Sequence, residues 1–405
     1  MKIQEINARL AGLAVFRGLR EDPVLADYAA LIRALAQGPA LDVCEAAGRF
    51  EAGLFAADTS DLSEYIASAV LECENICARR AARGQLSPAL EQALDGELRF
   101  LEELSGLGLD DLLDAAGLDA GQKAAYAFLP RWEAHPTGLA GAYKARLSEM
   151  GQVGYGMFAR HHVFMLDGEG RLTPVRHPDP QRLADLPGYE REREKILANT
   201  RGLLAGLPAN NVLLYGDAGT GKSSAVKAIA NEYAPQGLRL VEVKKNQLYL
   251  LPDLMDKLAA NPLKFILFID DLSFAANDDN FAALKAILEG SVGGRSHNVA
   301  VYATSNRRHL VKERMSDRTG DDLHEADTRQ ELMSLSARFG LTVTFQQPDK
   351  ARFDAILLDL ARQYGLQMPA DQLYLRGEAF ALRAGGRSPR VAKQFVELAA
   401  AGVGV

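Results

Sequence analysis

The stretch "NVLLYGDAGTGKSS" (residues 211–224) constrains the fold of this chain more than any other feature. Residues 216–223 fit the pattern G-x-x-x-x-G-K-[ST] in full, behind an apolar run and ahead of the helix-forming run "SSAVKAIANEY". Glycines let backbone N–H groups curl around a phosphate, and the N-terminus of the following helix adds partial positive charge. The pattern therefore predicts a strand, a phosphate-binding loop and a helix, in that order.

The residues of this loop have separate expected roles. Lys222 would reach the β- and γ-phosphates of a nucleotide, and the hydroxyl of Ser223 would bind Mg²⁺. The loop residues expected to contact the nucleotide are Gly216, Asp217, Ala218, Gly219, Thr220, Gly221, Lys222, Ser223 and Ser224.

An acidic pair follows a second apolar run, "KFILFIDD" (residues 264–271). The carboxyl ends of buried parallel strands form the usual ligand-binding edge of such sheets. We expect Asp270 to hold Mg²⁺ through water and Asp271 to orient or deprotonate an attacking water. A helix cap or a turn is the alternative for two adjacent aspartates, but the complete phosphate loop favours the functional interpretation.

Asn306 follows a third apolar run, "NVAVYATS" (residues 298–305). If this run is another parallel strand, the Asn306 amide emerges at the same edge and could hold the γ-phosphate or the attacking water. Polar residues after a strand are also common turn formers, so this assignment depends on its place beside the other two motifs.

The fold class follows from the alternation of strands and helices after residue 180. Apolar, β-branched runs occur at 211–215, 238–243, 264–269, 298–304 and 341–345, and helical stretches separate the first four. This alternation predicts an α/β fold with a parallel five-stranded sheet covered by helices on both faces. A hairpin is expected ahead of it at "HHVFMLDGEGRLTPVR", where a structural role is favoured for His161 and His162 over a metal site.

Four regions are expected along the chain. Residues 1–155 read as a helical N-terminal domain, rich in Ala, Leu, Glu and Arg, with apolar residues at three- and four-residue spacing. Residues 156–180 would form the hairpin and a linker, 181–347 the α/β nucleotide-binding core, and 348–405 a small helical lid.

Charge and composition exclude some classes of protein. The formal net charge is −7, and residues 1–155 hold 14 Lys and Arg against 23 Asp and Glu, which argues against a strongly basic nucleic-acid coat. Cys73 and Cys77 are expected on one helical face as free thiols, with no further ligand to complete a zinc site. Because no stretch approaches about 20 apolar residues, we expect a cytoplasmic protein with no membrane partner.

Taken together, the motifs resemble those of the AAA+ ATPases, and within them a prokaryotic group known as domain of unknown function 815. The resemblance covers about residues 180–400. It is carried by "LPANNVLLYGDAGTGKSSAVKAIANEY", "GLRLVEV", "FILFIDDLSF", "ALKAILEGSV", "NVAVYATSNRRHLV", "LSARFGLTVTF" and "GGRSPRVAKQF". The helical front end resembles the group more loosely.

The resemblance implies further site residues. "SARFG" looks like the box that carries the arginine finger, so Arg338 would act on the γ-phosphate of a neighbouring subunit. "GGRSPRVAKQF" looks like the sensor-2 helix of the lid, with Arg390 as the contact within the same chain and Arg387 as the second choice. "LADLPGYE" resembles the segment that packs on adenine and implicates Leu186 and Gly188. Without the resemblance, each arginine would read as an ordinary surface charge.

The resemblance also implies a function. The chain would bind and hydrolyse ATP with Mg²⁺, as a homo-oligomer that remodels or loads a protein or nucleic-acid complex. One departure bears on the rate, because many relatives carry Glu where this chain has Asp271, and the shorter side chain is expected to slow hydrolysis. One alternative is a nucleotide-dependent switch or scaffold that hardly turns over and presents its helical N-domain to a partner. Another is a small-molecule kinase, which shares the phosphate loop but needs no arginine finger.

Overall fold

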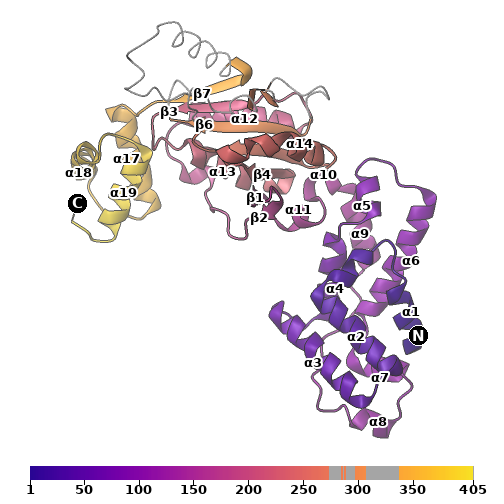
Figure 1. Cartoon of the computed structure of the whole chain (residues 1–405). Coiled ribbons are helices and arrows are strands. Elements are labelled where there is room, and N and C mark those ends of the chain that lie inside the picture. The colour runs from indigo at the N-terminus through magenta and orange to yellow at the C-terminus, as the bar shows by residue number, and fades with distance from the viewer. Residues whose placement is uncertain (273–283, 286, 289–296, 307–336, 405) are drawn as a thin grey trace. The chain divides into compact units, whose positions relative to one another are not determined.

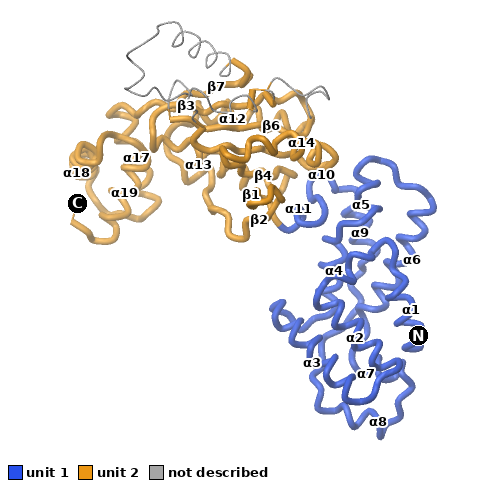
Figure 2. Tube along the Cα trace, viewed as in Figure 1, with its two compact units in different colours: residues 1–160 blue, residues 161–405 orange. Residues whose placement is uncertain are grey.

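The computed structural model describes residues 1–272, 284–285, 287–288, 297–306 and 337–404. Most of the segment "ALKAILEGSV", and the ends of "FILFIDDLSF" and "NVAVYATSNRRHLV", lie outside the described residues. The chain forms two compact units, Met1–Arg160 and His161–Val405, shown in blue and orange in Figure 2.

The unit Met1–Arg160 is built from helices that pack around one apolar core. Tyr28, Phe50 and Trp132 form an aromatic cluster in this core, with ring centroids 4.9 Å apart for Tyr28–Phe50 and for Phe50–Trp132. The helices are α1 (Ile3–Ala11), the 3₁₀ turn η1 (Arg17–Glu21), α2 (Pro23–Gln37), α3 (Ala40–Ala56), α4 (Leu62–Glu72), α5 (Ile76–Ala81), α6 (Pro88–Ser105), α7 (Leu109–Ala115), α8 (Ala120–Ala124), α9 (Leu139–Ser148), α10 (Met150–Val153) and α11 (Met157–Arg160).

Two of the three cysteines of this unit flank a break between helices. The apolar spacing predicts one helix across them, but α4 ends at Glu72 and α5 begins at Ile76. The break has a local cause, because the Asn75 side chain accepts from the amide of Ala78 and so caps α5. The expectation that Cys73 and Cys77 share one helical face is therefore wrong, since Cys73 follows α4 as its C-cap residue and Cys77 is buried in α5.

Two glutamates of α6 accept hydrogen bonds from the backbone of two loops of the same unit. Glu97 accepts hydrogen bonds from the backbone amides of residues 14–16, and Glu102 accepts from those of residues 137–139. A carboxylate that takes several backbone N–H groups satisfies donors that would otherwise lose their partners on burial. These contacts fix the loops ahead of η1 and of α9 onto α6.

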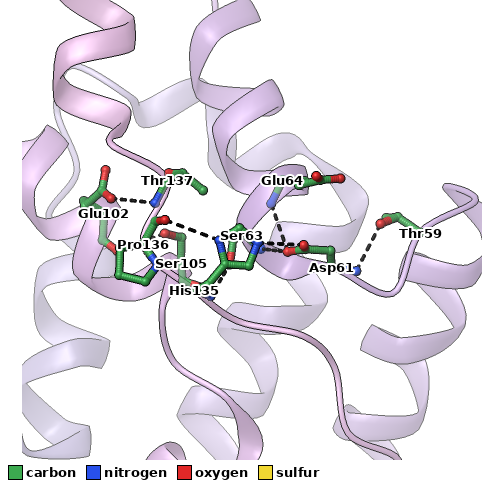
Figure 3. A network of polar contacts seen from close by, with 9 residues as sticks. All are labelled: Thr59, Asp61, Ser63, Glu64, Glu102, Ser105, His135, Pro136 and Thr137. Carbon is green, nitrogen blue, oxygen red and sulfur yellow. Dashed lines mark hydrogen bonds and ion pairs between the residues drawn. The ribbon is translucent and has the colours of Figure 1, made fainter.

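A polar network joins the start of α4 to the segment ahead of α9 (Figure 3). Asp61 accepts from the amides of Ser63 and Glu64 and so caps α4, and its other oxygen lies 2.9 Å from Nε2 of His135. The buried Ser63 hydroxyl accepts from the His135 amide at 2.6 Å and donates to the Ser105 carbonyl at 3.1 Å. The Ser63 hydroxyl thus contacts the backbone of His135 and not its ring, unlike the serine of a catalytic triad. The network therefore stabilises the contact between α4 and the segment ahead of α9.

The unit His161–Val405 is built on a seven-stranded sheet in the order β2-β1-β4-β5-β6-β3-β7. The strands are β1 (Val163–Leu166), β2 (Leu172–Pro174), β3 (Val212–Gly216), β4 (Leu238–Glu242), β5 (Lys264–Ile269), β6 (Val299–Ser305) and β7 (Leu341–Phe345). All neighbouring pairs are parallel except β1 with β2.

The expectation of five strands is wrong, and the hairpin is the reason. β1 and β2 form the expected hairpin, but β1 also pairs in parallel with β4, so both strands extend the same sheet. A hairpin turn can be predicted from local sequence. The pairing of β1 with β4 cannot, because it joins residues far apart in the chain, such as Val163 and Leu240.

This unit contains two groups of helices (Figure 1). One group packs on the sheet, and the other forms the C-terminal end of the chain. Buried side chains of the sheet and of the last three helices belong to one core. The first group is α12 (Glu190–Leu204), α13 (Lys222–Tyr233) and α14 (Leu251–Ala259), with 3₁₀ turns η2 (Leu183–Asp185), η3 (Ala234–Gln236) and η4 (Lys245–Leu250). The second group, yellow in Figure 1, is α17 (Lys350–Gln363), α18 (Ala370–Arg383) and α19 (Pro389–Ala400). None of the helices within the described ranges combines the length and the hydropathy needed to cross a membrane.

The register of the parallel strands sets which residues meet at their carboxyl ends. Tyr215 of β3 pairs with Ser305 of β6, and Ile269 of β5 pairs with Ala303 of β6. On the other side of β3, Gly216 pairs with Phe345 of β7. The residues that follow β3, β5 and β6 therefore emerge together at one edge of the sheet.

The polar network around Asp61 predicts a pH dependence. The hydrogen bond and charge of Asp61 raise the pKa of His135 above its usual 6.5. Burial acts to raise the pKa of Asp61, but the Glu64 amide and His135 outweigh it and hold that pKa below 3.8. The His135 contribution to stability is therefore present below pH 6.5 and is lost as the pH rises through its raised pKa, and the Asp61 contribution is lost at acid pH.

We expect the His135 ring in the full chain to titrate above pH 6.5, as followed by NMR of its ring protons. Asp61→Asn keeps an oxygen that can cap α4 but removes the negative charge beside His135. The titration midpoint of the His135 ring should therefore fall toward 6.5. Asp58→Asn, at an exposed position nearby in the sequence, is the matched control and should leave the titration unchanged. An equal shift in both variants would contradict the assignment of the effect to the Asp61–His135 pair.

Candidate nucleotide-binding site

A cavity of about 860 Å³ lies at the carboxyl edge of the parallel strands. One part of its lining comes from the phosphate loop and the strand ends, namely residues 218–224, Asp270, Asp271, Thr304 and Asn306. The rest comes from the segment ahead of α12 and from the C-terminal helices, namely residues 179–181, residues 185–187, Leu360, Gln363, Tyr364, Pro389, Arg390 and Lys393. The volume suits a ligand of nucleotide size.

The loop begins at a tight contact between the ends of β3 and β7. Gly216 has φ 132°, and a Cβ atom at this position would lie 2.0 Å from the carbonyl oxygen of Phe345. That oxygen accepts from the amide of Asp217 at 2.9 Å, and the Asp217 carboxylate accepts from the Gln347 amide at 2.6 Å. Only glycine fits at this contact, so the loop starts at a place fixed by the end of β7.

Lys222 opens α13 and is 5% exposed. Its ammonium donates to the carbonyl oxygens of Gly216 at 3.0 Å and Asp217 at 2.6 Å. Burial lowers the pKa of Lys222, while the carboxylates of Asp217, Asp270 and Asp271 act in the opposite direction. The three carboxylates thus partly offset the cost of burying the ammonium charge, which the two loop carbonyls accept as hydrogen-bond partners.

The Asp270 carboxylate is the shared acceptor of the site. Its Oδ1 accepts from the Ser223 hydroxyl at 2.6 Å, from the Thr304 hydroxyl at 2.5 Å and from the amide of Asp271 at 3.1 Å. Ser223 belongs to the phosphate loop, Asp270 follows β5 and Thr304 lies in β6, so one oxygen joins three elements. The two residues expected to hold Mg²⁺, Ser223 and Asp270, are thus in direct hydrogen-bond contact.

Asp271 has the left-handed backbone conformation, with φ 50°. Its amide donates to the Thr304 hydroxyl oxygen at 2.9 Å, and its carboxylate accepts from the Asn306 side chain at 2.9 Å. Among residues with a side chain, Asp and Asn adopt this conformation most readily. The backbone therefore gives a reason for Asp at this position in place of the longer Glu.

Arg390 reaches the same cavity from the C-terminal helices. Its amide donates to the carbonyl oxygen of Gly219 at 3.2 Å, and the residue is exposed and lines the cavity. Arg387 instead forms hydrogen bonds of 2.7–3.1 Å with the Glu378 carboxylate of α18 and does not line the cavity. Of these two arginines, the structure thus brings Arg390 to the phosphate loop.

The remaining expected residues, Leu186, Gly188 and Arg338, lie in three different places. Leu186 lines the cavity, whereas Gly188 sits behind it, where an added Cβ would lie 3.1 Å from Ile356 of α17. Arg338 precedes β7, at the amino end of the strands, so the structure does not bring it to the cavity of its own chain. Its predicted action on a neighbouring subunit stays a prediction.

The donors at the loop fit a magnesium ion. The Ser223 hydroxyl and the Asp270 carboxylate are hard oxygen ligands 2.6 Å apart on the cavity wall. Within the described residues there is no cluster of three or more His, Cys, Asp or Glu side chains that could hold a metal ion. Mg²⁺ suits this arrangement, because it is commonly bound by one or two protein oxygens together with waters and the phosphates of its substrate.

Sequence reasoning missed Thr304. It is 2% exposed, donates to Asp270 and accepts from the amide of Asp271, so it fixes both aspartates. The available signal was a hydroxyl residue at the end of an otherwise apolar strand, two residues ahead of Asn306. The strand register places it beside the end of β5.

A family model described as protein of unknown function (DUF815) matches residues 159–403. The chain belongs to this family. The membership expected from the sequence motifs is thereby confirmed, and the match contains every residue of the candidate site. A search among curated proteins found no match.

Several solved structures are similar to part of the chain. They include two point mutants of RuvB from Thermotoga maritima, with 19% and 18% identity and TM-scores of 0.38 and 0.37. These matches cover 55% and 54% of this chain and 67% and 64% of the RuvB chains. A third is the RuvB Holliday junction branch migration motor of the same organism, with 17% identity, a TM-score of 0.37 and coverage of 55% and 67%.

Proposed function

We propose that the protein is an ATPase that binds ATP with Mg²⁺ in this cavity and transfers the γ-phosphoryl group to water. The observation that carries the proposal is the meeting of Lys222, Ser223, Asp270 and Asp271 at one edge of the sheet, on one cavity wall. Resemblance to the AAA+ ATPases agrees with it, and so do the cavity volume and the placement of Arg390.

The phosphate loop would bind the β- and γ-phosphates. Residues 218–224 line the cavity, and Lys222 would exchange its bonds to two loop carbonyls for bonds to phosphate oxygens. Ser223 and Asp270 would hold Mg²⁺, which when bound neutralises charge on the phosphates. The exposed side chain of Arg390 would add a further positive charge at the γ-phosphate.

Asp271 and Asn306 would act on the attacking water. The Asp271 carboxylate lies in the cavity lining, and its hydrogen bonds hold it in one orientation. It would accept the proton of the water as the water oxygen attacks the γ-phosphorus and the bond to ADP breaks. Asn306 donates one amide hydrogen to Asp271, which leaves the other for the water or a phosphate oxygen.

The biological role we propose is that of an oligomeric remodelling or loading factor. An arginine that acts on the phosphate of another subunit requires at least two copies, and Arg338 lies away from the cavity of its own chain. The helical unit Met1–Arg160 is a compact body outside the ATPase core and would contact the client.

Asp271→Asn tests the enzyme directly. Asn tolerates the left-handed backbone and keeps a partner for Asn306, but it cannot take a proton. We expect steady-state ATP hydrolysis to fall by about 100-fold or more, while ATP affinity stays within about threefold of the wild type. Asp253→Asn, at an exposed position of α14, is the matched control. If the wild type turns over no faster than Asp271→Asn, the protein is a nucleotide-dependent switch and not an ATPase.

Arg338→Ala tests the shared site. The rate of hydrolysis per chain should rise with protein concentration in the wild type, because the finger comes from a second copy. The variant should lose about 100-fold in rate and the concentration dependence with it. Arg383→Ala, at an exposed position of α18, should behave as the wild type does. A rate independent of concentration and insensitive to Arg338→Ala would favour the small-molecule kinase alternative.

A further inference from the structure

One wall of the cavity is formed by residues 179–188, of which six line it: Asp179, Pro180, Gln181, Asp185, Leu186 and Pro187. Within these ten residues the only regular element is the single turn η2 (Leu183–Asp185). A segment with so little secondary structure keeps its shape through contacts with its neighbours. Two side chains outside the cavity lining supply such contacts, one near each end of the segment.

Asn231 of α13 holds the first end. Its side-chain amide donates to the carbonyl oxygens of Asp179 at 2.8 Å and Gln181 at 2.9 Å, which uses both of its hydrogens. Its oxygen lies 2.9 Å from Nε2 of His162. Because a side-chain amide oxygen only accepts, the histidine donates from Nε2. The three contacts fix the orientation of the Asn231 amide, and α13 is the helix that begins in the phosphate loop.

Arg193 of α12 holds the second end. It is 8% exposed, and its guanidinium donates to the carbonyl oxygens of Leu186, at 2.7 Å, and Gly188. A fork of two donors from one rigid group fixes both the position and the direction of the two carbonyls. Gly188, with φ 72°, turns the chain here.

Tyr189 joins this end of the wall to the phosphate loop. Its ring stacks on Phe345 with centroids 5.4 Å apart, and its hydroxyl donates to the Gln346 carbonyl at 2.6 Å. Phe345 is the residue whose carbonyl takes the amide of Asp217 at the start of the phosphate loop. One end of the wall is therefore tied to α13, which carries Lys222 and Ser223, and the other to the end of β7, which contacts the start of the phosphate loop.

The wall and the loop present different chemistry to a ligand. Leu186 and Pro187 offer apolar surface and Gln181 an amide, as a planar base requires, whereas Lys222 and Ser223 offer charge and a hydroxyl. We propose that Arg193 and Asn231 are positioning residues that hold the 179–188 wall against the base of a bound nucleotide and so determine base selectivity. This inference rests on the proposed function, because it takes the ligand to be a nucleotide.

The test compares ligands with and without a base. Arg193→Met keeps the length of the side chain but removes its donors, and Asn231→Asp keeps the shape but replaces the donor amide by an acceptor that faces two carbonyls. Arg191→Met, at an exposed position of the same helix, and Asn246→Asp, also exposed, are the matched controls. Dissociation constants are measured by calorimetry with Mg²⁺ for ATP, GTP and inorganic triphosphate.

We expect each variant to weaken ATP binding by about tenfold or more and to reduce the preference between ATP and GTP, because the wall no longer meets the base. Binding of inorganic triphosphate should stay within about twofold of the wild type, because the phosphate loop is intact. Two results would overturn the inference: an equal loss for ATP and triphosphate in both variants, or unchanged ATP affinity and selectivity in both. Failure of the wild type to bind ATP at all would instead refute the proposed function.

Discussion

The candidate site depends on the pairing of β3 with β6 on one side and β7 on the other. This register brings the end of β3 level with Ser305 and Phe345, and β6 in turn aligns the end of β5. At Gly216 the approach to the Phe345 carbonyl leaves no space for a side chain. The phosphate loop, the two aspartates and Asn306 come from separate parts of the chain, and the backbone pairing is what assembles them.

Within that frame, hydrogen bonds fix the acidic groups before any ligand arrives. Asp270 Oδ1 has three donors, and Asp271 is held through its amide and its carboxylate. Lys222 lies among carboxylates whose charge opposes the effect of its burial on its pKa. Acidic groups that hydrogen bonds already hold in one orientation need little rearrangement when charge develops at a phosphate. Such preorganisation is the condition for efficient electrostatic stabilisation.

The sequence predicted the parts of the site whose chemistry is local. The phosphate loop, the aspartates after β5 and Asn306 each follow a recognisable strand. Loop residues 218–224, both aspartates and Asn306 line one cavity, whereas Gly216 and Asp217 lie outside its lining. The sequence did not predict that the β1–β2 hairpin joins the sheet, because the β1–β4 pairing links residues far apart in the chain. Thr304 was missed since a hydroxyl in a buried strand reads as an ordinary strand residue. Arg193 and Asn231 were missed because their partners are backbone carbonyls, which no sequence pattern marks.

The most direct measurement of the central claim is the affinity for ATP with Mg²⁺, by titration calorimetry, of the wild type and Lys222→Ala. Lys195→Ala, at an exposed position of α12, is the matched control. We expect saturable binding by the wild type and the control, and an affinity about 100-fold or more lower in Lys222→Ala, because the buried ammonium is the main positive charge of the loop. Equal affinities for ATP in the wild type and Lys222→Ala would contradict the central claim.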